Sequence, residues 1–332
     1  MQRRRLLRSG LLLTGAAAAG TLAVMSGFAR SLRTAPEFTG IDGWINASTP
    51  VTVSALRGKV VLVNFWTYSC INCRRTIPYL KRWQSEYGPA GLQVIGIHTP
   101  EFRFEHTRPN VDAYVREQAI PYPVGQDNEF RTWDAWENEA WPGFYLLDKQ
   151  GQIVMVRLGE DHAHEIESSI RSLLGLPSTG TVGQPGDDPD FSHIGSPEMY
   201  FGAQHPTPQD TRQSPQLGEA HYSFSQAAGP GSGPVLNQYL LDGVWSREGE
   251  RLVLRSARGG LRLRFSASDL YLVATAPQTA AVRIRVDGRE MRPVQIGWPT
   301  LYTLVSGESY GEHLIELEAD TPGLALFSAT FG

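Results

Sequence analysis

The stretch KVVLVNFWTYSCINC, residues 59–73, decides the fold class of this 332-residue chain. Its first seven residues form a nearly continuous apolar run rich in β-branched side chains, which is typical of a strand buried on both faces of a mostly parallel sheet. Apolar residues with helical spacing follow from about Cys73 to Tyr87, and Pro78 is expected to kink that helix. A buried strand that passes through a short turn into a helix predicts an α/β architecture.

The chain continues to alternate between strands and helices after this stretch. We therefore predict an α/β sheet with helices on both faces over residues 36–175, and turn-rich residues 36–58 are expected to add a small amino-terminal hairpin. The remaining elements are expected as a strand at Leu92–His98, a helix at Val111–Gln118, a hairpin of Phe144–Asp148 with Ile153–Arg157, and a closing helix at Ala163–Leu174.

The composition and the spacing of apolar residues change in the carboxy-terminal half of the chain. Residues 176–197 are dominated by Gly, Pro, Ser and Asp and predict a linker. Residues 198–332 then predict an antiparallel sandwich or jelly roll, with tight hairpins at Gly259-Gly260 and Asp287-Gly288. Seven or so short strands are expected, at 251–254, 261–265, 270–274, 281–286, 302–305, 313–318 and 324–331.

Charge and cysteine content exclude several classes of protein. The formal net charge is −4, and residues 1–29 hold four arginines and no acid, so the rest of the chain is still more acidic and a poor candidate for nucleic-acid binding. The chain has two cysteines, Cys70 and Cys73. One close pair is too few for a disulfide-stapled secreted domain and lacks the further ligands of a zinc site, so we expect no metal. The pair points to redox chemistry.

The amino terminus is typical of an export signal. Residues 1–29 have a basic start, an apolar stretch and small residues at the end, and Arg3-Arg4-Arg5-Leu6-Leu7-Arg8 is similar to a twin-arginine signal. Residues 10–28 would just span a bilayer, so a retained membrane anchor is the alternative. Either way, we expect an extracytoplasmic protein, in the periplasm or cell envelope.

The position of the cysteines suggests their chemistry. A thiol at the start of a helix lies close to unsatisfied backbone N–H groups and the positive end of the helix dipole, and we expect this to lower the pKa of Cys70. Cys70 would then attack a substrate disulfide, and Cys73 would resolve the mixed disulfide. A permanently closed structural CxxC loop is the alternative.

The same residues resemble the active-site strand and turn of thioredoxin-like proteins. The wording WTYSCINC (66–73), IGIHTPEF (95–102) and WPGFYLLD (141–148) resembles the extracytoplasmic part of DipZ-type proteins, over roughly residues 36–332. That resemblance implies an α/β thioredoxin fold followed by an all-β jelly-roll or sandwich domain like a carbohydrate-binding module. Because no CcdA-like membrane portion is present, it also implies a separate CcdA- or DsbD-like membrane electron donor. No bound cofactor is implied.

The resemblance also assigns residues to the site. Trp141-Pro142 is similar to the family's cis-proline, which lies beside the cysteines and pairs with substrate, and a plain loop proline is the alternative. Trp66 would pack beside the active-site turn, or would be a core aromatic. Asn64 stands where many thioredoxins have a buried Asp, and it cannot move a proton. Glu101 occupies the place of a Glu in related tethered thioredoxins, which makes it a candidate base for Cys73 or a surface residue that caps the following loop.

Three functions follow from these observations. The first is an exported oxidoreductase that reduces or isomerises disulfides in protein substrates. The second is an oxidase that forms disulfides, and the third is a cell-envelope glycan-binding protein with an inert thioredoxin domain. Trp245 and Trp298 are the candidate sugar-stacking residues, and each is equally suited to a core. A thiol peroxidase is disfavoured by Tyr68 and Ser69 before Cys70. The Ile71-Asn72 spacer has no positive charge or histidine, which favours a reductant.

Overall fold

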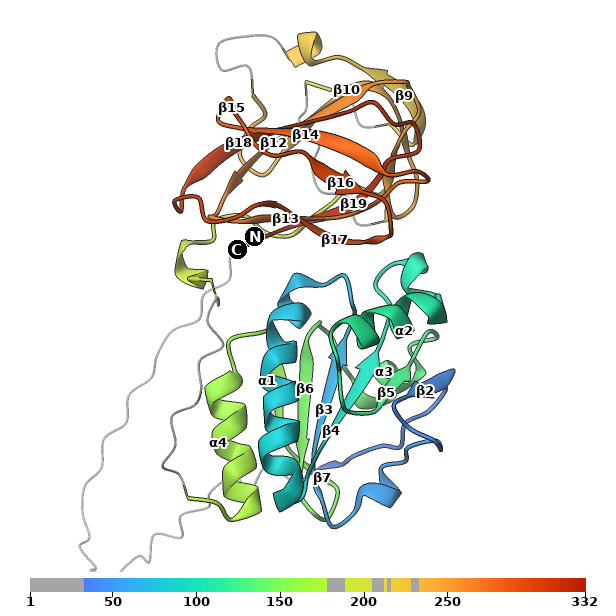
Figure 1. Ribbon diagram of the computed structural model, residues 1–332, viewed down its shortest axis with the longest axis vertical. Helices are drawn as coiled ribbons and strands as arrows, with labels where there is room; N and C mark the ends of the chain where they lie inside the picture. Colours follow the sequence, from blue (N-terminus) through green and yellow to red (C-terminus); the bar gives the residue numbers. More distant parts are fainter. Residues whose placement is uncertain (1–32, 178–188, 205–211, 214–215, 228–232) are drawn as a thin grey trace, which may run out of the picture. The chain divides into compact units, whose positions relative to one another are not determined.

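The computed structural model describes residues 33–177, 189–204, 212–213, 216–227 and 233–332. The predicted export signal, residues 1–29, lies outside this part of the chain, as does most of the predicted linker. Among the described helices, none is both long and apolar enough to cross a membrane. The described residues have the predicted fold class, a thioredoxin-like α/β fold followed by an all-β domain (Figure 1).

The α/β fold is built on a mixed sheet whose central strand is β3 (Val60–Trp66). β3 runs parallel to β4 (Leu92–His98) and antiparallel to β6 (Gly143–Leu147), and all seven of its residues are buried. Within the described residues the strand order is β1-β7-β6-β3-β4-β5-β2, in which β5 (Val124–Gln126) is parallel to β4 and β7 (Gln152–Leu158) is antiparallel to β6. The predicted buried strand and the predicted hairpin are therefore confirmed.

Helices cover both faces of this sheet, as predicted. α1 (Ile71–Tyr87) and α4 (Ala163–Leu174) lie side by side on one face (Figure 1), and α2 (Arg108–Glu117) packs into the same core. The other face is covered by α3 (Arg131–Trp136) together with apolar residues that precede β3. α1 begins two residues earlier than predicted because Cys70 is its N-cap.

The predicted amino-terminal hairpin within residues 36–58 is wrong. β2 (Gly43–Ile45) pairs with β5, and β1 (Arg33–Thr34) pairs with β7, so these strands lie on opposite edges of the sheet. The segment is also held by Glu37, whose carboxylate accepts a hydrogen bond from the backbone N–H of Val53 at 2.7 Å. Strands of two or three residues are too short for hydrophobic periodicity to reveal their partners.

The all-β domain has antiparallel pairing throughout its described residues, around one continuous hydrophobic core. The strands are β8 (Met199–Tyr200), β9 (Gly218–Tyr222), β10 (Tyr239–Arg247), β11 (Leu252–Leu254), β12 (Gly259–Ser266), β13 (Leu270–Thr275), β14 (Ala280–Val286), β15 (Arg289–Glu290), β16 (Val294–Ile296), β17 (Thr300–Val305), β18 (Glu312–Ala319) and β19 (Ala325–Phe331). The seven predicted strands are confirmed, but β8, β9, β10, β15 and β16 are not predicted from the sequence. In β10, Asp242-Gly243 interrupts the apolar residues.

One of the two predicted tight hairpins is present. Asp287 and Gly288 join β14 to β15 with φ values of 50° and 78°, which is the backbone conformation that this type of turn requires. The hairpin at Gly259-Gly260 is wrong, because both residues lie inside β12. A Cβ on Gly259 would lie 2.3 Å from a methyl carbon of Leu254, so the glycine there permits close packing rather than a turn.

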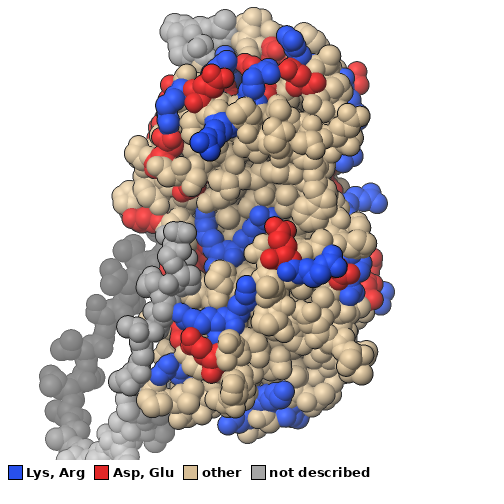
Figure 2. All heavy atoms as spheres, viewed as in Figure 1, with Lys and Arg blue, Asp and Glu red and all other residues tan. Residues whose placement is uncertain are grey.

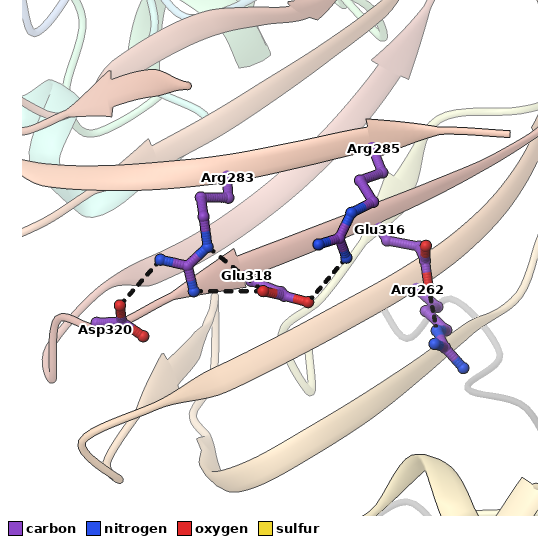
Figure 3. Close-up of polar contacts among 6 residues, drawn as sticks. All are labelled: Arg262, Arg283, Arg285, Glu316, Glu318 and Asp320. Atoms are coloured by element: carbon purple, nitrogen blue, oxygen red, sulfur yellow. Dashed lines mark hydrogen bonds and ion pairs between the residues drawn. The ribbon is translucent and has the colours of Figure 1, made fainter. Parts of the chain in front are cut away.

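The sheet formed by β12, β14 and β18 carries paired charges on one face (Figure 3). Arg283 and Arg285 both contact the carboxylate of Glu318, at 3.2 and 3.1 Å. Arg283 also contacts Asp320, and Arg262 contacts Glu316 at 2.6 Å on the neighbouring strand pair. Charges of both signs are likewise intermixed over the face of the molecule in Figure 2. Such a surface does not resemble the clustered basic patch of a nucleic-acid-binding protein.

Candidate redox site

The two cysteines lie directly after β3, at the start of α1. Cys70 is the N-cap residue, and its Sγ accepts a hydrogen bond from the backbone N–H of Cys73 at 3.3 Å. Both are free thiols, Cys70 partly exposed and Cys73 buried. One sulfur can therefore be reached from outside while the other stands one helical turn behind it, which is the arrangement that attack and resolution require.

The turn before Cys70 is held by a buried carboxylate, Glu105. Its Oε1 accepts hydrogen bonds from the backbone N–H and the hydroxyl of Ser69, at 3.2 and 2.6 Å. Its Oε2 accepts bonds from the backbone N–H groups of Glu101 and Phe102, at 2.7 and 3.0 Å. Glu105 thus ties the redox turn to the loop that follows β4, and burial raises its pKa.

The redox turn also contacts the all-β domain. The ring of Tyr68 stacks on Trp298 with centroids 5.4 Å apart. Arg74 donates hydrogen bonds to the carbonyl of Tyr68 at 2.7 Å and to Oγ1 of Thr300 at 2.6 Å. Ile71 belongs to an apolar cluster whose other members include Leu301. Both ends of the CxxC turn are therefore packed against residues more than 200 positions away in the sequence.

A cavity of about 270 Å³ lies beside Cys70. A second cavity, of about 330 Å³, shares Glu101, Trp141 and Tyr200 with the first. Among the described residues that line the two cavities, the charged ones are all glutamates and come from both folds: Glu101, Glu139, Glu198 and Glu250.

Two of these glutamates are linked through a tyrosine. The hydroxyl of Tyr200 donates a hydrogen bond to Oε1 of Glu101 at 2.6 Å, and it is also hydrogen-bonded to the carboxyl group of Glu198. Oγ1 of Thr330 donates to Oε1 of Glu198 at 2.9 Å. Burial raises the pKa of Glu101, and Glu198 and Glu105 raise it further. Burial raises the pKa of Glu198 as well, although its side chain still reaches solvent.

The prediction that the helix start lowers the pKa of Cys70 is wrong. The hydrogen bond with the Cys73 side chain raises the pKa of Cys70, and burial raises it further. The negative charges of Glu101 and Glu198 act in the same direction because they repel a thiolate. The sequence places only the favourable helix terminus beside Cys70, whereas folding also brings two carboxylates to it.

Of the other residues that the sequence assigns to the site, some line the cavity beside Cys70 and others lie in the core. The Trp141–Pro142 peptide bond is cis, as predicted, and the Trp141 side chain lines the cavity beside Cys70 and donates to the Thr99 carbonyl at 3.0 Å. Trp66 is 1% exposed and packs on His98, so we assign it to the core beneath the turn rather than to a substrate-contacting surface. The buried side-chain amide of Asn64 donates a hydrogen bond to the carbonyl of Gly143, which follows the cis-proline.

Glu101 lies in the cavity with Cys70, and its electrostatic contact is with that thiol. It is therefore neither the exposed loop cap that was the alternative nor a demonstrated partner of Cys73. Sequence reasoning misses Glu105, Glu198 and Tyr200. Glu105 carries a weak signal, since it lies four residues beyond Glu101 in a short loop, but no local pattern marks the other two.

The two tryptophans considered as sugar-stacking platforms are both engaged. Trp245 is 2% exposed and belongs to the core of the all-β domain. Trp298 is more exposed, but one face of its ring is stacked on Tyr68. Trp245 therefore presents no free aromatic face for a glycan, and Trp298 has one face of its ring already covered.

Comparisons with known proteins cover both folds. Residues 196–332 match the family described as thioredoxin like C-terminal domain, and residues 32–156 match the AhpC/TSA family. The chain is 33% identical to DipZ of Mycobacterium tuberculosis over 309 residues, which is 91% of this chain and 43% of that protein. It therefore spans less than half the length of the DipZ proteins that it matches.

Shorter relatives cover the α/β fold. The thiol-disulfide oxidoreductase YkuV of Bacillus subtilis is 29% identical over 42% of this chain and 93% of its own length. Among solved structures, a thioredoxin-like protein in the oxidized form has 28% identity and a TM-score of 0.41, covering 43% of this chain and 96% of that one. The chain is thus homologous to DipZ along most of its length and to a named thiol-disulfide oxidoreductase over its first fold.

Proposed function

We propose that the chain is an exported thiol–disulfide oxidoreductase that reduces or isomerises protein disulfides, because it is homologous to DipZ and carries two neighbouring cysteine thiols at the start of a helix. The observation that supports this most is the difference in exposure between the two sulfurs. Cys70 lines a cavity, whereas Cys73 is buried and its backbone N–H donates a hydrogen bond to the Cys70 sulfur. A nucleophile in front of a resolving thiol is what two-step exchange needs.

The reaction uses two electrons. The Cys70 thiolate attacks one sulfur of a substrate disulfide, the substrate S–S bond breaks, and a mixed disulfide forms. Cys73 then attacks Cys70, and the second substrate thiol leaves with a proton. Trp141 and Pro142 line or flank the cavity where the substrate segment would lie. The protein ends with a Cys70–Cys73 disulfide, which needs a reductant, and the DipZ resemblance makes a CcdA-like membrane carrier the proposed donor.

Reduction is favoured over oxidation by the charges around Cys70. Strong oxidants of this type have a stabilised thiolate, which favours their reduced form. Here two carboxylates oppose the thiolate, so the reduced form gains no such stabilisation. Glycan binding by the all-β domain has no comparable support from the two tryptophans.

The test is insulin reduction with the full chain, dithiothreitol being the electron donor. We expect wild type to turn over, Cys70→Ser to be inactive, and Cys73→Ser to accumulate a mixed disulfide on Cys70 because the resolving thiol is gone. Glu86→Gln, at an exposed position on α1 away from the cysteines, provides a control and should keep wild-type activity. Hydrogen peroxide consumption is measured in parallel, since residues 32–156 match the AhpC/TSA family. Equal activity of wild type and Cys70→Ser, or turnover of peroxide alone, would refute the proposal.

A further inference from the structure

The cavity beside Cys70 adjoins a second cavity that the exchange reaction itself does not use. The first, of about 270 Å³, and the second, of about 330 Å³, have Glu101, Trp141 and Tyr200 in common. A disulfide that reacts with Cys70 must enter the first cavity, because the thiol is partly exposed and lines that cavity. A substrate side chain close to that disulfide is therefore well placed to enter the second cavity.

The second cavity combines aromatic side chains with a carboxylate. Phe102, Phe130 and Trp141 line it from the α/β fold. Glu250 lines it from the all-β domain, and the Glu250 carboxylate accepts a hydrogen bond from the backbone N–H of Arg103 at 3.2 Å. Aromatic rings attract cations and pack against aliphatic stems, and a carboxylate pairs with the charged end. This combination suits the side chain of a lysine or an arginine.

The carboxylates of both cavities have no basic partner among the described residues. Neither cavity is lined there by Lys, Arg or His, and the lining glutamates form no ion pair within this part of the chain. Arg251, which follows Glu250 in the sequence, is paired with Glu248 at 2.9 Å instead. Burial and neighbouring carboxylates raise the pKa of Glu101, and a cation brought by a substrate would lower it again.

The all-β wall of the second cavity is held in place by backbone contacts. The N–H groups of Ala203 and Gln204 donate to the carbonyls of Glu248 and Gly249, at 2.9 and 2.8 Å. Gly202 allows this close approach, since a Cβ there would lie 2.4 Å from the carbonyl oxygen of Gly249. A site formed before the ligand arrives costs less ordering on binding.

We propose that the second cavity is a subsite for a lysine or arginine side chain, so that the protein selects peptide segments with a basic residue close to the disulfide. This inference rests on the proposed exchange reaction and names its substrate class. The all-β domain then acts in substrate selection, because Glu250 belongs to it. The same carboxylates disfavour anionic disulfides such as glutathione disulfide, since like charges repel.

The test compares substrates that differ only in charge. They are disulfide-linked dimers of one short peptide, with Lys, Ser or Glu placed two positions before and after the cysteine. Prereduced full-length protein reacts with each dimer in a single turnover, and the released peptide thiol is quantified after an acid quench. We expect the second-order rate constant to be about tenfold larger for the Lys dimer than for the Ser dimer, and smallest for the Glu dimer.

Glu250→Gln tests the subsite itself. Glutamine has nearly the same shape and can still accept the hydrogen bond from Arg103, but it carries no charge. We expect it to lower the ratio of the Lys to the Ser rate constant about threefold. Glu86→Gln, which also removes one negative charge but at an exposed position on α1, is the matched control and should keep the wild-type ratio.

The salt dependence of the wild type tests the same charge effect without a substitution. The preference for the Lys dimer should shrink as NaCl rises from about 20 mM to about 500 mM, because salt screens the attraction. Equal rate constants for the Lys and Ser dimers at low salt, or a ratio that Glu250→Gln leaves unchanged, would overturn the subsite and leave the oxidoreductase proposal intact. A faster reaction with glutathione disulfide than with the Lys dimer would do the same. Failure of the wild type to reduce any of these disulfides or insulin would refute both.

Discussion

Replacing Glu105 by Gln should weaken the support of the redox turn without changing the size of the side chain. The carboxylate is fully buried and accepts four hydrogen bonds, two on each oxygen. A glutamine keeps one oxygen and presents an NH₂ group where the other was, so two donors lose their acceptor and face another donor. An unsatisfied buried donor costs about 1–3 kcal/mol, and loss of the buried charge offsets part of that cost.

We therefore expect Glu105→Gln to lower the free energy of unfolding by about 2 kcal/mol. Urea unfolding followed by tryptophan fluorescence measures this, and Glu86→Gln, an exposed position on α1, should stay within about 0.5 kcal/mol of wild type. The loosened turn should also raise the rate at which iodoacetamide alkylates Cys70. Stability equal to wild type, with an unchanged alkylation rate, would show that the carboxylate does not hold the turn.

Three other perturbations test different parts of the structure. Burial raises the pKa of Glu198 in the folded state, so its protonation stabilises the fold at low pH, and this stabilisation is lost as pH rises through the folded-state pKa. A glutamine does not titrate, so Glu198→Gln should gain stability relative to wild type between pH 5 and pH 8 in urea titrations. Burial lowers the pKa of His313, but its hydrogen bonds with Asp287 and with the Ser309 carbonyl, together with nearby negative charge, raise the pKa overall. The pair with Asp287 therefore stabilises the fold below the ordinary histidine range and less so as pH rises. Asp287→Asn should accordingly cost under about 1 kcal/mol at pH 5.5 and less at pH 8, by the same titrations. Gly259→Ala should lower stability by about 1–3 kcal/mol through overpacking, whereas Gly311→Ala, where a Cβ meets open space, should have little effect on the thermal midpoint.

The parts of the site that the sequence predicts are those fixed by local spacing. Two cysteines three residues apart at a helix start must lie close together, and an uninterrupted apolar run such as β3 must be buried on both faces. The cis bond before Pro142 is predicted by resemblance and is present. The short edge strands β1 and β2 are not predicted, because two or three residues are too few to show the alternation of apolar and polar residues that marks a strand.

The electrostatics of the site depend on contacts that no local pattern encodes. Glu105 reaches Ser69 across 36 residues, and Tyr200 reaches Glu101 across 99. Local reasoning therefore captures the helix terminus beside Cys70 but not the opposite effects of the Cys73 hydrogen bond, burial and the two carboxylates, which raise the pKa of Cys70. An expectation about a thiol pKa holds only when every charge within a few ångströms comes from the same element.

The reversed sign changes the argument about the direction of electron flow. From the sequence, a reductant is favoured only because the Ile71-Asn72 spacer lacks a group that stabilises a thiolate. In the structure, the negative charges of Glu101 and Glu198 destabilise a thiolate at Cys70. Since the free energy that stabilises a thiolate also stabilises the reduced protein, removing negative charge beside Cys70 should make the Cys70–Cys73 couple more oxidising. The all-β domain, which holds Glu198, thus bears on the redox potential of the cysteine pair.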